Sequence, residues 1–248
     1  MDSQSSITVD AGLDALHAHQ VVLFAVASMA ELRESDTASH LLRIKHYVRL
    51  LAEKLQSQAA LATVLSADYI DALCTSVCMY DLGTVAIPDR ILLKPGRLTP
   101  EELAIMMTHT SRGYEAIVRA EKLLGLHSPM LAIAKELTQS HHEKWNGKGY
   151  PKGLSENQIP LSARLVALAD VYDALISNKI YRQGMSYEAA VGVIFSERGE
   201  HFDPDVVDAF MELTVEFEDV AARFADSEHD MQNKIDYMAN AIAENAEI

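Results

Sequence analysis

Histidines and acidic residues recur along this chain at spacings that could assemble a metal site. Asp36 and His40 lie four residues apart, so on a helix both side chains would face the same way. His141 and His142 are adjacent and would close a helix directly before a glycine-rich segment. Further candidates are Asp81, His109 and Asp170. Mixed imidazole and carboxylate ligands suit first-row transition metals, so this set predicts a site for Fe, Mn, Co, Ni or Zn.

Other residues with metal-binding chemistry have a simpler interpretation. A lone histidine on a helix is more often a surface or core residue than a ligand, which we expect for His17, His19, His46, His127 and His201. The two cysteines, Cys74 and Cys78, are too few for a disulfide framework. They could be soft ligands, but their spacing of one helical turn favours small side chains packed in the core.

The elements that must position these residues are predicted to be helices. Leu41, Ile44 and Val48 recur at spacings of three and four, which is typical of a helix with one apolar face. Three helix starts show a capping residue followed by proline, at Thr99, Ser128 and Asp203. We expect helices over 10–33, 37–57, 67–80, 100–124, 129–141, 162–178, 187–197 and 204–214, and one or two more to the end.

Two long segments interrupt the helical pattern. Residues 82–98 and 143–160 are rich in glycine and proline, and the second holds the single tryptophan of the chain. Loops of this length inside a helical domain are usually functional. The sequence shows no convincing strand and no internal repeat, so it predicts an all-α fold.

Composition and charge exclude several classes of protein. The chain has 248 residues, 49% of them hydrophobic and 23% charged, which is ordinary for a folded domain. Its net charge of −15 would repel a nucleic-acid polymer. A small anionic ligand remains compatible if metal ions supply positive charge. The N-terminus lacks signal-peptide features, and no apolar stretch reaches the roughly 20 residues of a membrane span. We therefore expect a cytoplasmic protein without a membrane segment.

The glycine-rich segment resembles a known signature. Residues 141–151, HHEKWNGKGYP, are similar to the signature of the HD-GYP family of cyclic di-GMP phosphodiesterases, a bacterial signalling branch of the HD metal-dependent phosphohydrolases. Further matches are IPD at 87–89, KPGRLT at 94–99, ADVYDAL at 169–175 and HFDP at 201–204. The resemblance covers roughly residues 34–212.

This resemblance implies a fold and a division of the chain. The expected architecture is an HD-type helical bundle with a short N-terminal helix and an extra C-terminal helix. The expected segments are an N-terminal helical segment at 1–33, an HD-GYP-like domain at 34–215 and a C-terminal helical extension at 216–248.

The resemblance also assigns a ligand set to a centre of one to three metal ions, Fe or Mn ahead of Ni, Co and Zn. The residues at the family's ligand positions are Asp36, His40, Asp81, His109, His141, His142 and Asp170. One ion would be held by Asp81, His109, His141 and His142, and a second would have His40, Asp81 and Asp170. In the family, two such metals activate a phosphodiester for hydrolysis.

Two positions depart from the family pattern. Tyr80 stands where the family has the histidine of its His-Asp pair, next to Asp81. As a phenolate it could bind ferric iron; as a neutral phenol it would only hydrogen-bond or block the position. Thr84 replaces a lysine thought to assist at the phosphate, so it keeps a hydroxyl and loses a charge. Loss of such a donor commonly costs about 10²–10³ in rate.

The remaining candidates concern the substrate and the loop. The resemblance places Lys179, Tyr181 and Arg182 at the substrate phosphates, and Tyr150 could stack on a guanine. Gly147 and Gly149 are expected to supply backbone conformations that bring Tyr150 and Pro151 to the pocket mouth.

These observations favour metal-dependent hydrolysis of a phosphodiester in cyclic di-GMP or a related cyclic dinucleotide, weakened by Tyr80 and Thr84. The alternative is a catalytically inactive module that binds metal, a cyclic dinucleotide or a GGDEF-domain partner. Such partners, and a homodimer, are compatible with the sequence.

Overall fold

The computed structural model describes residues 11–31, 33, 37–94, 96–178, 183–232 and 235–236. Within these ranges the regular structure is helical, and the exception is one isolated bridge between Arg198 and Phe202. The all-α prediction is therefore confirmed. The elements are α1 (Ala11–Glu31), α2 (Ala38–Gln56), α3 (Ala67–Ser76), η1 (Val77–Met79), η2 (Leu82–Ala86), α4 (Asp89–Leu92), α5 (Pro100–Met107), α6 (His109–Leu124), α7 (Pro129–Ser140), η3 (Glu156–Gln158), α8 (Leu161–Ile176), α9 (Tyr187–Ser196), α10 (Pro204–Met211) and α11 (Thr214–Arg223).

Helices α5, α7 and α10 begin at the prolines that the sequence indicated. Thr99 and Glu102 form a reciprocal capping box ahead of α5. The Ser128 hydroxyl accepts a hydrogen bond from the Leu131 N–H at the start of α7. Asp203 caps α10 by accepting from the Asp205 N–H. These local signals were sufficient because capping bonds connect residues only two or three positions apart.

Two segments differ from the sequence prediction. The helix expected over 100–124 is two helices, α5 and α6, separated at Thr108. The Thr108 hydroxyl donates to the Ile105 carbonyl at 2.7 Å, which competes with the regular helical pattern. The segment 82–98, expected as a loop, contains the short helices η2 and α4. The break at Thr108 matters because His109 is the first residue of α6.

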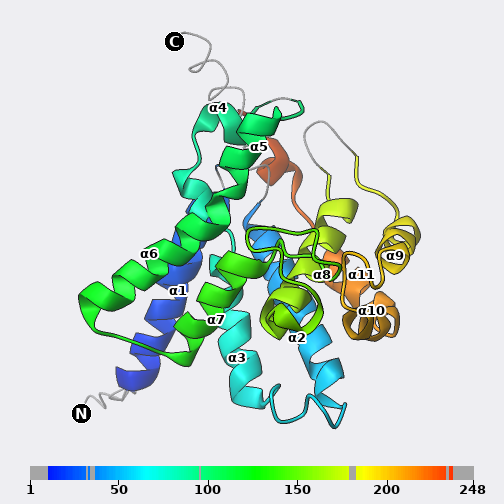
Figure 1. The fold of residues 1–248 in the computed structure, drawn as a ribbon, viewed down its shortest axis with the longest axis horizontal. Coiled ribbons are helices and arrows are strands. Elements are labelled where there is room, and N and C mark those ends of the chain that lie inside the picture. The colour runs from blue at the N-terminus through cyan, green and yellow to red at the C-terminus, as the bar shows by residue number, and fades with distance from the viewer. Residues whose placement is uncertain are drawn as a thin grey trace, which may run out of the picture.

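The core lies around α2 and α8, which occupy the middle of the bundle (Figure 1). Four aromatic rings from different helices meet there without exposure to solvent: Tyr47, Tyr172, Phe210 and Phe217. Tyr47 stacks on Phe217 with ring centroids 4.4 Å apart, and Tyr172 meets Phe217 edge-on at 5.3 Å. This core fixes α2 and α8, which carry His40 and Asp170.

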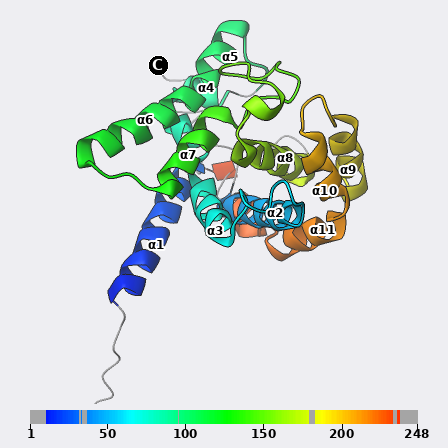
Figure 2. The same cartoon turned by 60° about the horizontal axis from the view of Figure 1, so that its bottom comes forward.

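The N-terminal helix has one packed and one exposed side. In Figure 2, α1 extends away from the rest of the bundle. Ala27 and Ala30 are buried, whereas Val22 and Met29 are more than 60% exposed. After α1, the Arg33 guanidinium donates to the carbonyls of Val85 and Ile87 at 2.6 and 3.1 Å. Arg33 therefore ties this end of the chain to the segment that follows Asp81.

The expected C-terminal boundary falls inside a helix. Helix α11 spans the division between 215 and 216, and Phe217 belongs to the core. The three-segment division of the chain stays a prediction. No helix among the described residues combines the length and the apolar character needed to cross a bilayer.

Candidate metal centre

Three turns of the fold bring four candidate ligands together. Asp81 follows η1, His109 begins α6, and His141 and His142 follow the last residue of α7. Gly83 lets the turn after Asp81 lie directly against α6, because a Cβ at this position would come within 1.9 Å of the His109 carbonyl oxygen. Helix α6 in turn packs on both η2 and α7. The ligand positions are therefore set by contacts between elements far apart in sequence.

The four side chains converge on one point. One ligand atom from each of Asp81, His109, His141 and His142 lies within 4.8 Å of the others. The Asp81 Oδ1 atom is 3.3 Å from His109 Nε2 and 3.2 Å from His141 Nε2. This carboxylate oxygen is buried and has no hydrogen-bond partner. We call these four residues the metal cluster.

Backbone hydrogen bonds orient the two buried imidazoles. His109 Nδ1 lies 2.8 Å from the Met106 carbonyl oxygen, and His141 Nδ1 lies 2.8 Å from that of Leu137. A carbonyl only accepts, so each Nδ1 must carry the proton. The two Nε2 atoms lie 3.4 Å apart, on the side of each ring that faces Asp81, where a bound metal would use them as ligand atoms. Such backbone contacts are the usual way in which a protein orients a metal-binding histidine.

The donor set fits a first-row transition metal. The two Nε2 atoms and Asp81 Oδ1 face the same small volume, and a buried polar atom without a partner, such as Asp81 Oδ1, is rare in folded proteins. A cation at this point would satisfy all of them at once. Three imidazoles and one carboxylate suit the borderline metals.

Burial and charge set the protonation states of Asp81 and His142. Burial alone would raise the pKa of the Asp81 carboxyl, but the charges of His141 and His109 outweigh it, and its pKa lies well below the usual range. Burial, together with the charge of His141, places the pKa of His142 well below its usual value. Asp81 is therefore a carboxylate and His142 a neutral imidazole at neutral pH, as metal binding requires.

The residues expected at a second ion are arranged differently. The Tyr80 hydroxyl lies 2.7 Å from His40 Nε2 and donates to Asp170 Oδ1 at 2.9 Å. On its other side, His40 Nδ1 lies 2.8 Å from Asp173 Oδ2. Arg43 makes two hydrogen bonds to the Asp173 carboxylate, at 2.6 and 2.9 Å. We call these five residues the tyrosine network.

Arg43 and Asp173 are buried neighbours of His40 that reasoning from ligand spacing missed. Both are at most 3% exposed. Their bidentate ion pair holds the Asp173 carboxylate in place beside His40 Nδ1, the nitrogen that does not face Tyr80. A signal was present in the sequence. Asp173 lies three residues after Asp170, and Arg43 lies three residues after His40, so each pair shares a helix face.

The glycine-rich loop is held by a buried carboxylate. Glu143 is 2% exposed and accepts hydrogen bonds from the backbone N–H groups of Lys152 and Leu154, at 2.8 and 3.0 Å. Gly149 passes so close to the chain that a Cβ there would lie 2.3 Å from the Lys144 nitrogen. Gly147 adopts a positive φ of 78°. Both glycines are therefore required by the loop, for different reasons.

The loop places Tyr150 over the metal cluster. Its ring stacks on His142 with centroids 4.8 Å apart and planes inclined by 27°. It meets His109 edge-on at 6.3 Å. Burial raises the pKa of the Tyr150 phenol, so it stays neutral. Pro151, next along the loop, is exposed.

The other candidates fall into two groups. Thr84 is 3% exposed, and its hydroxyl donates to the Asp81 carbonyl at 2.8 Å, so it is used within the turn after Asp81. Asp36, Lys179, Tyr181 and Arg182 lie outside the described residues.

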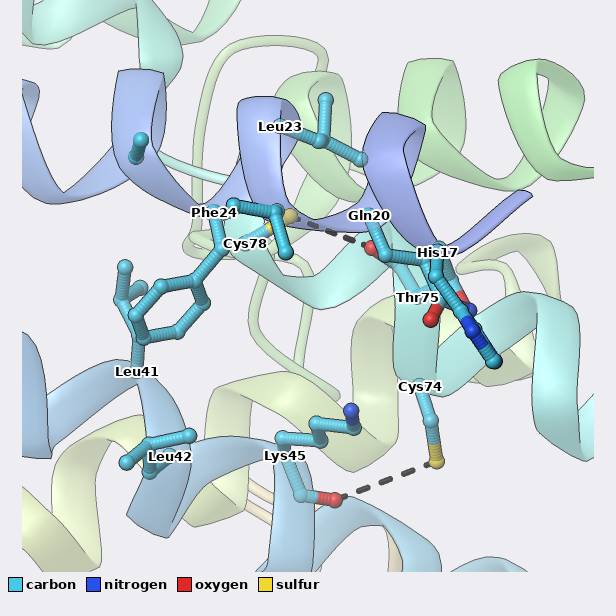
Figure 3. Close-up of a pocket in the computed structure, with 12 residues that line it drawn as sticks. His17, Gln20, Leu23, Phe24, Leu41, Leu42, Lys45, Cys74, Thr75 and Cys78 are labelled. Carbon is cyan, nitrogen blue, oxygen red and sulfur yellow. Dashed lines mark hydrogen bonds between the residues drawn. The ribbon is translucent and has the colours of Figure 1, made fainter. Parts of the chain in front are cut away.

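The two cysteines lie at a cavity away from the metal cluster. This cavity, of about 530 Å³, lies between α1 on one side and α2 and α3 on the other, and its walls include Phe24, Leu41 and Lys45 (Figure 3). Burial raises the pKa of Cys74 and of Cys78 to about 11, so both are thiols at neutral pH. Neither belongs to the metal cluster, in keeping with the interpretation as packed side chains.

Comparison with known proteins places the chain in a family. The profile of the HD domain family matches residues 26–206. A protein named probable cyclic di-GMP phosphodiesterase, from Vibrio cholerae serotype O1, is 50% identical over 210 residues, 85% of this chain and 48% of the relative. A cyclic di-GMP phosphodiesterase of Thermotoga maritima is 36% identical over 207 residues, 84% of this chain and 52% of the relative. This chain thus spans about half the length of these curated relatives.

A solved structure shares the fold. The crystal structure of a cyclic GMP-AMP-specific phosphodiesterase of V. cholerae superposes with a TM-score of 0.60 at 16% identity, over 91% of this chain and 59% of the other. At this identity the likeness supports the helical architecture alone.

Proposed function

This chain belongs to the HD-domain family, in its HD-GYP branch, and on that premise we propose that it hydrolyses a phosphodiester bond of a cyclic dinucleotide of the cyclic di-GMP class. The relatives named as cyclic di-GMP phosphodiesterases support this substrate class. Because this chain spans only about half of their length, their activity is carried over here as a proposal.

The observation that carries the proposal is the metal cluster. A buried, unpartnered Asp81 oxygen faces the Nε2 atoms of two imidazoles. Iron or manganese is the proposed metal, held by Asp81, His109, His141 and His142. When bound, the metal supplies Lewis-acid activation of a phosphoryl oxygen and of a water molecule.

The residues of the chain have separate tasks in this proposal. The Met106 and Leu137 carbonyls hold His109 and His141 in the tautomer that leaves Nε2 available. Tyr150 lies beside His142 and offers its ring to a nucleobase, where stacking contributes about 1–3 kcal/mol per base. In a chain of net charge −15, the metal provides positive charge for the substrate phosphate. Lys179, Tyr181 and Arg182 are the further phosphate contacts that we propose.

Turnover is proposed to be slower than the family's. Thr84 supplies no cation, and its hydroxyl is engaged with the Asp81 carbonyl. Absence of one electrostatic donor commonly costs about 10²–10³ in rate.

The test is a hydrolysis assay with defined metal content. The purified chain is stripped with chelator, loaded with Mn²⁺ or, without oxygen, with Fe²⁺, and incubated with cyclic di-GMP. Chromatography should show a linear dinucleotide that the Asp81→Ala variant does not form. No product from the metal-loaded chain, with product from an active family member in parallel, would contradict the proposal.

A second candidate is a binding module without turnover. The tyrosine network favours it, because the Tyr80 hydroxyl hydrogen-bonds to His40 and Asp170, the residues expected to hold the second ion. Calorimetry with cyclic di-GMP and with a GGDEF-domain protein distinguishes the two functions. Binding that Tyr150→Ala weakens about tenfold, while helical content is retained and no hydrolysis occurs, would favour the module.

A further inference from the structure

The Tyr80 hydroxyl occupies a shared position between two side chains that a second metal ion would need. It is 2.7 Å from His40 Nε2 and 2.9 Å from Asp170 Oδ1, and the Tyr80 side chain is 1% exposed. The nitrogen and the oxygen lie 3.8 Å from each other across it. A phenol donates one hydrogen bond and accepts others, so it can satisfy both groups.

The other polar groups of the tyrosine network also have hydrogen-bond partners within the protein. The second nitrogen of His40 is taken by Asp173, and Asp173 is held by Arg43 and accepts a further hydrogen bond from Ser177. The buried Asp173 carboxylate therefore already has a positively charged partner within the protein, since the Arg43 guanidinium is always ionised. An added ion would have to break hydrogen bonds in a buried site to enter.

The metal cluster shows the contrasting condition. There the Asp81 Oδ1 atom is buried without a hydrogen-bond partner, and two imidazole nitrogens face it. Among the described residues, His40 and Asp170 do not belong to the group whose ligand atoms converge. The fit to a metal is therefore good in the metal cluster and poor in the tyrosine network.

We propose that this chain has a one-metal centre, in which the Tyr80 hydroxyl and its hydrogen bonds take the place of the second ion. Asp81, His109, His141 and His142 hold the single ion. His40, Asp170 and Asp173 form a protein-only support beside it. The proposal rests on the proposed function only in requiring that the metal cluster binds a transition metal.

The test counts metal ions per folded chain. Protein stripped with chelator is saturated with Mn²⁺, freed of weakly bound metal by gel filtration, and measured by elemental mass spectrometry. The wild type should retain one ion. Tyr80→His removes the phenol and adds an imidazole, so it should retain two. Circular dichroism checks that each variant is folded.

Two further variants show which residues hold the ion, and a third replaces Tyr80→His if that variant does not fold. His40→Ala should keep one ion, because His40 is not a ligand in this proposal, whereas Asp81→Ala should keep none. If Tyr80→His does not fold, Tyr80→Ala replaces it, since it opens the same position beside His40 and Asp170 and should also raise the count above one at saturating Mn²⁺.

Several results would overturn the proposal. These are two ions in the wild type, loss of the ion in folded His40→Ala, or a count that stays at one after the phenol is removed. A visible phenolate-to-iron absorption band in wild type loaded with ferric iron would also overturn it, because Tyr80 would then be a ligand. Lack of hydrolysis by the one-ion protein would instead contradict the proposed function and leave this proposal standing.

Discussion

The metal cluster and the tyrosine network lie side by side and both contain histidine and aspartate, yet these side chains find their partners differently. In the metal cluster, backbone carbonyls fix His109 and His141, and their free nitrogens face an unpartnered Asp81 oxygen. In the tyrosine network, both nitrogens of His40 have protein partners, and Asp173 is paired with Arg43. The geometry of the metal cluster fits an external cation, whereas in the tyrosine network the hydrogen-bond partners come from the protein.

This difference shows that ligand identity does not define a metal site. What matters is whether the lone pairs are already used, because buried donors and acceptors gain little from a second partner and lose much when the first is removed. A single phenol, Tyr80, gives His40 Nε2 and Asp170 Oδ1 a hydrogen-bond partner, so these two atoms are already used within the protein.

The largest effect should come from breaking the metal cluster. His141→Ala combined with His142→Ala removes two ligands, so bound metal and hydrolysis should fall to background. Loss of a metal present at 100 times its Kd also removes about 2.7 kcal/mol of stability. Metal analysis and thermal unfolding with and without Mn²⁺ measure this.

The matched control is His127→Ala, which removes a histidine whose side chain is 76% exposed. This variant should keep the wild-type metal content and the stabilisation by Mn²⁺. Unchanged metal content in the double variant would show that the ligand assignment is wrong.

A second prediction breaks the tyrosine network without touching the metal cluster. Asp173→Ala removes the bidentate partner of the buried Arg43, which keeps only a longer ion pair to Asp226, and removal of one partner of a buried pair costs roughly 3–5 kcal/mol. The free energy of unfolding in urea measures the cost, and the folded variant should still bind its metal. By comparison, Asp208→Ala, in the exposed pair with Arg198, should cost at most about 1 kcal/mol.

The same carboxylate predicts an acid dependence. Burial alone would raise the pKa of Asp173, but hydrogen bonds and charges from His40 and Arg43 hold it far below the usual value. A folded-state pKa below the unfolded value of about 3.9 means that the stabilisation is present above that pH and is lost as the pH falls through the folded value. Below about pH 4, unfolding free energy should therefore fall more steeply in wild type than in Asp173→Asn, and parallel slopes would contradict this.

A smaller effect is expected from the loop over the metal cluster. Gly149→Ala would place a Cβ 2.3 Å from the Lys144 nitrogen and 2.5 Å from the Glu143 Cα, so the loop must shift. Such overpacking typically costs about 1–3 kcal/mol. Thermal unfolding should show this loss, whereas Gly192→Ala, inside α9 with nothing within 4 Å, should be neutral or stabilising by about 0.5–1 kcal/mol. Equal effects of the two substitutions would rule out the close approach at Gly149.

The sequence predicted features that depend on residues close along the chain. The helical period of α2 and the capping signals ahead of α5, α7 and α10 were sufficient for the all-α fold and for three helix starts. The break at Thr108 was missed, because a side-chain bond to the Ile105 carbonyl has no strong sequence signature.

The sequence by itself also determined which residue types could bind a metal, and that position 80 carries a phenol instead of an imidazole. Only the tertiary structure decided what this phenol does. Tyr80 reaches His40 and Asp170, which lie 40 and 90 residues away along the chain, because α2, η1 and α8 pack around one core. Helical spacing fixes the direction of a side chain within its own helix, but distances between helices of a bundle depend on how their buried faces pack. For that reason, the sequence left open whether Tyr80 binds a metal or blocks it, and the packed structure supports the second role.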